Sequence, residues 1–293
     1  MSLLDVRDLR VAYPSRAGPV PAVRGVDLDV AEGEVVGLAG ESGCGKSTVA
    51  HALLRLLPAG TEVTGGVLLD GEDVLTMRWG RLRAVRWTEA AIVFQGAMHS
   101  LNPVRRVGDQ ITEAIRLHDP GSDATRRVGE LFEMVGLPVR RSEDFPHELS
   151  GGQRQRVMIA MALACAPRLL IADEPTTALD VMVQAQVLGL LRTLQREFSL
   201  GLLFITHDLS VLSDLCDRIA VMYAGRVVEV GPAGSVFESP AHPYTRALSE
   251  AFPSVGDPAD RGVPGGLGGD PPDPQGIPPG CSFHPRCPAR FEP

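Results

Sequence analysis

The sequence predicts an α/β fold with a mostly parallel sheet, an antiparallel β portion and a helical portion. Short apolar strands at 168–172 and 201–206 alternate with helical stretches, which is typical of a parallel sheet. Segments 3–12 and 22–31 alternate apolar and polar residues, as half-buried antiparallel strands do. From about residue 108 to residue 145 the pattern becomes helical, with Gly, Pro and charged residues as breaks.

A glycine-rich loop lies between a predicted strand and a predicted helix. It reads GESGCGKST and fits G-x-x-x-x-G-K-[ST], the phosphate-binding loop or P-loop. Residues 34–39 precede it as a buried strand, and residues 48–57 follow it as an amphipathic helix that Pro58 ends. Such a turn directs backbone N–H groups and a positive helix end toward phosphate. The sequence therefore predicts a P-loop nucleotidase core. The residues expected to bind nucleotide here are Gly40, Ser42, Gly43, Cys44, Gly45, Lys46, Ser47 and Thr48.

Side chains within this loop have separate expected roles. Lys46 would reach the β- and γ-phosphates, and the Ser47 hydroxyl would ligate Mg²⁺. Cys44 lies beside the phosphate site, where a helix N-terminus can lower the pKa of a thiol. We therefore expect alkylation of Cys44 to inhibit activity, the alternative being that this residue only fills the loop.

The remaining folded elements follow in order. Residues 65–74 predict a strand and a turn, residues 218–223 a third buried strand, and residues 226–230 one more. A last helix is expected near 243–252.

Composition limits the class of protein. The chain has 293 residues, 44% of them hydrophobic, which suffices for one large or two small domains. Its net charge of -8 disfavours sequence-independent DNA binding. No apolar run approaches the roughly 20 residues that span a bilayer, and the N-terminus does not resemble a signal peptide. We expect a cytosolic protein that reaches a membrane only through partners. Five cysteines, an odd number, indicate free thiols.

Composition changes after residue 252. Of the 28 residues from 253 to 280, 8 are Pro and 8 are Gly. Such a segment has too few apolar side chains to offset the entropy lost on ordering. We expect a nucleotide-binding domain at 1–252, with its helical portion at about 100–165, and a C-terminal extension at 253–293. The extension is predicted to be a linker or extended tail with a short cysteine-bearing end.

Two further motifs narrow the chemistry. An apolar strand ends in Asp173 and Glu174; the first suits the outer coordination shell of magnesium, and the second suits a general base for water. The sequence LSGGQ at 149–153 opens an amphipathic helix, and two glycines at a helix start can form an anion site. Taken alone, this motif fits an ordinary glycine-rich N-cap better.

The motifs over residues 1–252 resemble, in order, those of ABC transporter nucleotide-binding subunits. LSGGQ is similar to the ABC signature. Gln95 matches the glutamine of the Q-loop, Asp180 the D-loop, and His207 the switch histidine. Tyr13 is placed where the family stacks an aromatic ring on adenine.

This resemblance implies a head-to-tail dimer with two ATP molecules between its nucleotide-binding domains. Each ATP would contact the P-loop, Asp173 and Glu174 of one chain and the signature of the other. Glu174 would activate water, and His207 and Gln95 would contact the γ-phosphate side. Lys46 completes the catalytic set. Mg²⁺ would be held by Ser47, Gln95 and Asp173, and the trans contacts would come from Ser150, Gly151, Gly152, Gln153 and Asp180.

Other stretches resemble one branch of the family, the dipeptide/oligopeptide (and nickel) importer ATPases. They are FQGAMHSLNP at 94–103, FPHELS at 145–150, HPYT at 242–245 and GCSFHPRCP at 280–288. The resemblance implies two membrane permeases, a second and usually different ATPase chain, and an extracytoplasmic binding protein. It places the chain at the cytoplasmic face of the membrane, with no nucleic acid partner.

The sequence departs from this branch at two places. Gly96, Ala97 and His99 replace the usual Asp, Pro and Thr, which leaves the exact transport system open. The extension of the branch often carries four cysteines that hold an iron–sulfur cluster, whereas only Cys281 and Cys287 are present here. The chain is truncated, the site needs a partner, or the motif is a relic.

Alternatives remain at this stage. The transported substrate can be another compound, such as nickel or an oligosaccharide, and the paired ATPase can be identical or different. A soluble ABC protein acting on DNA or ribosomes is disfavoured by the single P-loop and the negative charge. A small-molecule kinase would not need LSGGQ, and a non-hydrolysing regulator would not need both Glu174 and His207.

Overall fold

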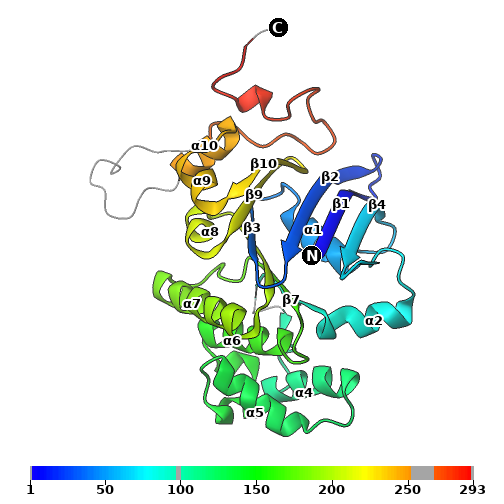
Figure 1. The fold of residues 1–293 in the computed structure, drawn as a ribbon, viewed down its shortest axis with the longest axis vertical. Coiled ribbons are helices and arrows are strands. Elements are labelled where there is room, and N and C mark those ends of the chain that lie inside the picture. Colours follow the sequence, from blue (N-terminus) through cyan, green and yellow to red (C-terminus); the bar gives the residue numbers. More distant parts are fainter. Residues whose placement is uncertain (1, 97–99, 252–266, 292–293) are drawn as a thin grey trace. The chain divides into compact units, whose positions relative to one another are not determined.

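The computed structural model describes residues 2–96, 100–251 and 267–291 (Figure 1). The chain divides into two compact units, which we describe separately. The P-loop unit comprises Ser2–Val30, Val35–Leu75 and Phe204–Pro293. The helical unit comprises Ala31–Glu34 and Thr76–Leu203.

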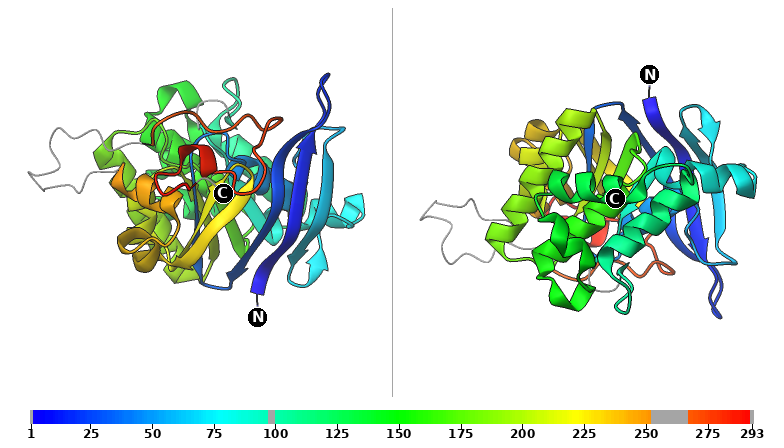
Figure 2. Two further views of the ribbon diagram at one scale, coloured as in Figure 1. Left: turned by 90° about the horizontal axis from the view of Figure 1, so that it is seen from above. Right: turned by 90° about the horizontal axis from the view of Figure 1, so that it is seen from below.

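A four-stranded sheet in the P-loop unit has the order β2-β1-β4-β5, and its long strands lie side by side in both views of Figure 2. The strands are β1 (Ser2–Tyr13), β2 (Val20–Ala31), β4 (Glu62–Leu69) and β5 (Glu72–Asp73). β1 runs antiparallel to β4, with a register shift between Arg7 and Arg10. Gly65 faces this irregularity with φ of 100°, and a Cβ there would lie 2.4 Å from the Asp8 carbonyl oxygen, so the bulge requires glycine. The two antiparallel strands predicted from alternation are confirmed.

The P-loop unit also contains the strand that leads into the P-loop. β3 (Val35–Ala39) is buried throughout and pairs in parallel with β9 (Arg218–Tyr223), and β10 (Arg226–Pro232) pairs antiparallel with β9. Buried strands of this kind read as continuous apolar runs. The helices of this unit are α1 (Lys46–Leu53), α8 (Leu209–Leu215), α9 (Ala233–Glu238) and α10 (Pro243–Glu250).

The helical unit combines helices with two parallel strands. β6 (Ala90–Val93) pairs in parallel with β7 (Leu169–Asp173). β8 (Gly201–Thr206) starts in this unit and ends in the other. The helices are α2 (Trp79–Thr88), α4 (Val107–His118), α5 (Ala124–Met134), α6 (Gly151–Ala162) and α7 (Val181–Phe198), with short 3-10 turns η1 (Val139–Glu143) and η2 (Pro146–Glu148). Parallel pairing and the intervening helices confirm the α/β class.

Some boundaries differ from the prediction. The helix after the P-loop starts at Lys46 rather than Thr48 and ends at Leu53, because Arg55 takes a left-handed conformation (φ 50°) well before Pro58. β4 begins three residues before the predicted start at residue 65. α2, β6 and α9 were not predicted. α2 buries only Leu82 and Val85, so its apolar periodicity is weak.

Among the described residues, no helix is both long and apolar enough to cross a membrane. The described part of the C-terminal extension, residues 267–291, holds one 3-10 turn, η4 (His284–Arg286). Ala97 and His99, two of the three branch departures, lie outside the described residues.

Candidate nucleotide site

The P-loop backbone is held in a conformation that only glycine allows at two positions. A Cβ at Gly40 would lie 2.2 Å from the carbonyl oxygen of Met222, and one at Gly45, where φ is 107°, would lie 2.4 Å from that of Ala22. Gly43 has φ of 80° and open space around it. The two ends of the loop therefore pack closely against the backbone at Met222 and Ala22, whereas its middle has open space around it.

Lys46 crosses the base of this loop. Its ammonium group donates hydrogen bonds to the carbonyl oxygens of Gly40 at 2.7 Å and Glu41 at 3.0 Å, and the residue is 4% exposed. Gly45 is the N-cap residue just before α1 and provides no side-chain cap, and no acidic residue lies in the first turn. A buried cation beside an uncapped helix start fits the negative charge of a polyphosphate.

Cys44 is buried beside Lys46. The residue is 5% exposed, and its burial raises the pKa of the thiol despite the neighbouring Lys46. The expectation that the helix N-terminus lowers this pKa is wrong, because desolvation penalises the thiolate more than the nearby positive charge favours it.

The other predicted residues of the P-loop unit lie around α1 and the end of β8. The Tyr13 hydroxyl is 3.1 Å from Oγ1 of Thr48, which joins the end of β1 to the first turn of α1. Ser47 is half-buried in that turn, whereas Ser42 is exposed. His207 follows β8 directly and is exposed.

The acidic pair lies at the end of β7 in the helical unit. Asp173 is 2% exposed, and Glu174 follows in a left-handed conformation with φ of 46°. Oε2 of Glu174 accepts hydrogen bonds from Nε2 of Gln95 at 2.9 Å and from Oγ1 of Thr177 at 2.8 Å. The fold thus joins two predicted residues, Gln95 and Glu174, and both donors hold the carboxylate in one orientation. Thr177 was not predicted; its only sequence signal is a hydroxyl three residues after an acid.

The signature sequence forms the start of α6. Ser150 and Gln153 make a reciprocal capping box: Oγ of Ser150 accepts from the Gln153 N–H at 3.3 Å, and Oε1 of Gln153 accepts from the Ser150 N–H at 3.0 Å. A Cβ at Gly152 would lie 2.5 Å from Cγ1 of Val183, so glycine is needed where α6 meets α7. Gly151 has more room, with Leu179 at 3.5 Å.

Asp180 caps the next helix. Its carboxylate accepts a hydrogen bond from the N–H of Val183 at 3.0 Å at the start of α7. Val181 and Met182 come directly afterwards and are 81% and 72% exposed. Two exposed apolar side chains therefore directly follow the D-loop aspartate.

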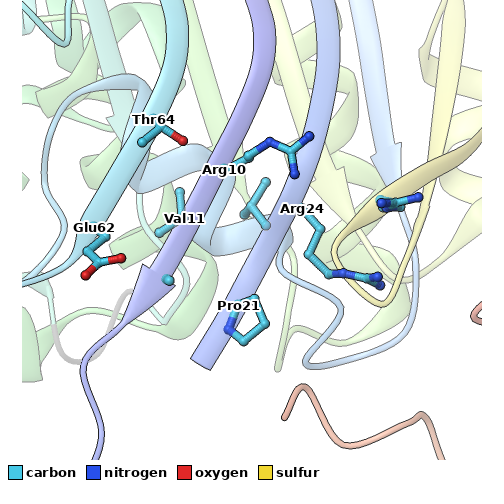
Figure 3. Close-up of a pocket in the computed structure, with 9 residues that line it drawn as sticks. Arg10, Val11, Pro21, Arg24, Glu62 and Thr64 are labelled. Carbon is cyan, nitrogen blue, oxygen red and sulfur yellow. The ribbon is translucent and has the colours of Figure 1, made fainter. Parts of the chain in front are cut away.

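The P-loop unit also contains a pocket of about 350 Å³ (Figure 3). Arg10 and Thr64, cross-strand partners on β1 and β4, line it together with Arg24 and Arg226. Burial and the two neighbouring arginines lower the pKa of Arg24. None of the predicted nucleotide residues lines this pocket. Tyr13 instead turns toward α1.

The cysteines of the extension do not present a cluster site. Cys281 is exposed, Cys287 is half-buried, and both are free thiols. Within the described part of the chain, no group of three or more His, Cys, Asp or Glu residues could hold a metal ion. The residues described here do not fit an iron–sulfur cluster, which takes four ligands.

Comparisons with known proteins identify the family. A family model described as ABC transporter matches residues 23–177. The chain belongs to the ABC transporter family. A second model, described as the oligopeptide/dipeptide transporter C-terminal region, matches residues 228–293.

Relatives and solved structures agree with this membership. The chain is 48% identical to a putative peptide import ATP-binding protein of Brucella abortus, over 97% of the chain and 87% of that protein. It is 44% identical to the oligopeptide transport ATP-binding protein OppD of Escherichia coli, over 99% of the chain and 87% of that protein. The dimeric ATP-binding cassette MJ0796, in a post-hydrolysis state with ADP and Pi, matches with a TM-score of 0.71 and 28% identity, over 78% of the chain and 98% of that structure. The chain is an ABC ATPase.

Proposed function

We propose that this ATPase energises the import of peptides. The observation that carries the proposal is the match of residues 228–293 to the C-terminal region of oligopeptide/dipeptide transporters. The nucleotide motifs alone do not distinguish among transported substrates, whereas this region is described for one class of transporter. Relatives named for peptide import at 44–48% identity support the same assignment.

Nucleotide binding is assigned to the P-loop. Lys46, whose ammonium group donates to two carbonyl oxygens, would exchange these partners for phosphate oxygens. Backbone N–H groups at the start of α1 would bind the remaining phosphate charge, and Tyr13 would stack on adenine. Ser47, Asp173 and Gln95 would hold Mg²⁺, which supplies positive charge against the phosphate oxygens.

Hydrolysis is assigned to Glu174 as general base. Its carboxylate, oriented by Gln95 and Thr177, would take a proton from the water that attacks the γ-phosphate. His207, exposed after β8, would contact the γ-phosphate. The orientation of a base by two donors before substrate binds reduces the reorganisation required in the transition state.

The trans half of the site is assigned to the signature and D-loop of a second nucleotide-binding domain. The half-buried start of α6, preceded by the exposed Ser150, offers backbone N–H groups with no acidic residue in its first turn. The apolar side chains of Val181 and Met182, beside Asp180, would be covered when two domains close. ATP binding would close the dimer, and hydrolysis would let it reopen.

Partners follow from the same proposal. The chain would dock on two permeases at the cytoplasmic face of the membrane, pair with a second ATPase chain, and serve an extracytoplasmic binding protein. Docking is assigned to the segment after Gln95, where Val104 is 79% exposed. Because Val104 is exposed, a charge placed there would change this surface without disturbing the buried core.

Affinity purification of the tagged chain from detergent-solubilised native membranes, followed by mass spectrometry, tests the proposal. We expect two permeases, a second ATPase and a binding protein that binds peptides. Val104→Asp should lose the permeases and keep ATP binding. Phe198→Asp, at an exposed position at the end of α7, is the matched control and should keep them.

Other outcomes assign the alternatives. A recovered binding protein that takes nickel or an oligosaccharide, and no peptide, would replace peptide as the transported substrate. Ribosomal or DNA-repair proteins without any permease would overturn the transport role while leaving the ATPase intact.

A further inference from the structure

One residue of the C-terminal extension forms a partly buried ion pair with the P-loop. Both terminal nitrogens of Arg286 donate to the Glu41 carboxylate, at 2.7 Å and 3.0 Å. The Arg286 side chain is only 6% exposed and that of Glu41 is 24% exposed. Two parallel hydrogen bonds between a guanidinium and a carboxylate fix distance and orientation together.

The guanidinium is held on its other sides as well. Nε of Arg286 donates to the Gly268 carbonyl oxygen at 3.0 Å, and the group lies over the ring of Tyr223, 5.8 Å from its centroid. The bidentate bond to Glu41 raises the pKa of Arg286 from its already high ordinary value. The guanidinium is therefore a permanent, oriented positive charge beside the P-loop.

An aromatic cluster places the turn that carries Arg286. Phe283 is 1% exposed and packs edge-on against Tyr223 at 5.3 Å and Tyr244 at 5.4 Å between ring centroids. Tyr223 and Tyr244 are themselves 4.6 Å apart. Edge-to-face packing of this kind is directional, so the turn after Phe283 projects Arg286 toward Glu41.

Glu41 is the point where these contacts meet the nucleotide site. Its N–H donates to the Tyr244 hydroxyl at 2.9 Å, and its carbonyl oxygen accepts from Nζ of Lys46 at 3.0 Å. Every polar group of this residue is thus used, with its carboxylate bound to Arg286. Any displacement of Glu41 would also displace the carbonyl that positions the Lys46 ammonium.

Charge gives a second reason for the pair. Glu41 places a carboxylate within a loop that binds phosphate, and like charges at short range in a partly buried site repel strongly. Arg286 neutralises this charge. Without Arg286, an unpaired carboxylate would remain next to the polyphosphate.

We propose that Arg286 is a positioning residue for the nucleotide site: by pairing with Glu41 it orients the P-loop and cancels the one negative side chain in it. The C-terminal extension is then a working part of the ATP site and not only a tail. This inference rests on the phosphate-binding role assigned to the P-loop.

The test compares ATP binding by the full chain and its variants by titration calorimetry, with KM and kcat measured for hydrolysis. Arg286→Ala should raise Kd and KM for ATP about tenfold and change kcat by less than about twofold. Arg286→Lys, which keeps the charge but loses the bidentate geometry, should fall between this variant and the wild type. Arg290→Ala is the matched control. Arg290 is an exposed arginine of the same extension that donates to the Pro285 carbonyl, and its substitution should leave Kd, KM and kcat unchanged.

A second background separates positioning from packing. In Glu41→Gln chains, where no carboxylate needs neutralising, Arg286→Ala should change Kd by less than about threefold. An undiminished tenfold effect in that background would mean that Arg286 only supports the fold, and the proposal would be wrong. An unchanged Kd in Arg286→Ala itself would also overturn it.

Lys46→Ala distinguishes this inference from the function on which it rests. Loss of ATP binding in Lys46→Ala with none in Arg286→Ala overturns the positioning role alone. Intact ATP binding in Lys46→Ala overturns the assigned P-loop role as well.

Discussion

Replacement of Glu174 by glutamine tests the assignment of the general base most directly. The substitution keeps the size of the side chain and leaves an amide oxygen that can accept the hydrogen bonds from Gln95 and Thr177. The free energy of unfolding should therefore change by less than about 1 kcal/mol. What is lost is the proton acceptor. General base catalysis contributes roughly 10²–10⁴-fold, so kcat should fall by that factor, or about 2.7–5.4 kcal/mol in the barrier.

The assay is steady-state phosphate release at saturating Mg-ATP, with thermal unfolding and ATP-dependent dimer formation measured on the same sample. The Glu174→Gln chain should bind ATP, remain dimeric and release almost no phosphate. Thr177→Val, which removes one hydrogen bond from the same carboxylate, is the matched control and should lower kcat by less than about tenfold. Turnover at the wild-type rate in Glu174→Gln would refute the assigned role.

Three further predictions address other parts of the site. Lys46→Ala should weaken ATP binding at least about tenfold in calorimetry, because a buried ammonium is removed from the phosphate site. Cys44 should be alkylated more slowly than exposed Cys281 near pH 8, since its raised pKa keeps the thiol protonated; peptide mapping that finds Cys44 labelled first would contradict this. Gly152→Ala should destabilise the chain by about 1–3 kcal/mol in denaturant unfolding, and Val183→Ala should restore most of that loss, because the new methyl group meets Cγ1 of Val183.

Elements with a continuous apolar pattern were predictable from the sequence alone. The strands at 201–206 and 218–223 were predicted with their observed bounds, because every residue of the first and nearly all of the second are buried. α2 was missed for the opposite reason. Its interior includes Arg86 and Trp87 in non-helical conformations, so no single helical face exists for a periodicity to reveal.

The candidate site was predictable as a set of motifs but not as a set of contacts. The spacing of the P-loop determines where phosphate-binding groups occur, since the chemistry depends on local backbone geometry. The bond between Gln95 and Glu174 joins residues 79 positions apart and depends on β6 pairing with β7. The raised pKa of Cys44 depends on burial, which only the folded structure provides. The local sequence around each residue reveals neither the Gln95–Glu174 hydrogen bond nor the burial of Cys44.

The C-terminal extension shows what a compositional argument leaves out. The Pro- and Gly-rich segment at 253–280 is predicted to have too little apolar surface to offset the entropy of ordering, about 1–2 kcal/mol per residue, and burial of one phenylalanine stabilises by only about 1.5–3 kcal/mol. Phe283 follows that segment and packs on two tyrosines of β9 and α10, so the extension does not have to bear the entropy of ordering those tyrosines. Proline further reduces the freedom that is lost on docking. A segment that cannot fold alone can therefore be ordered on a surface built elsewhere, and average composition does not report whether that surface exists.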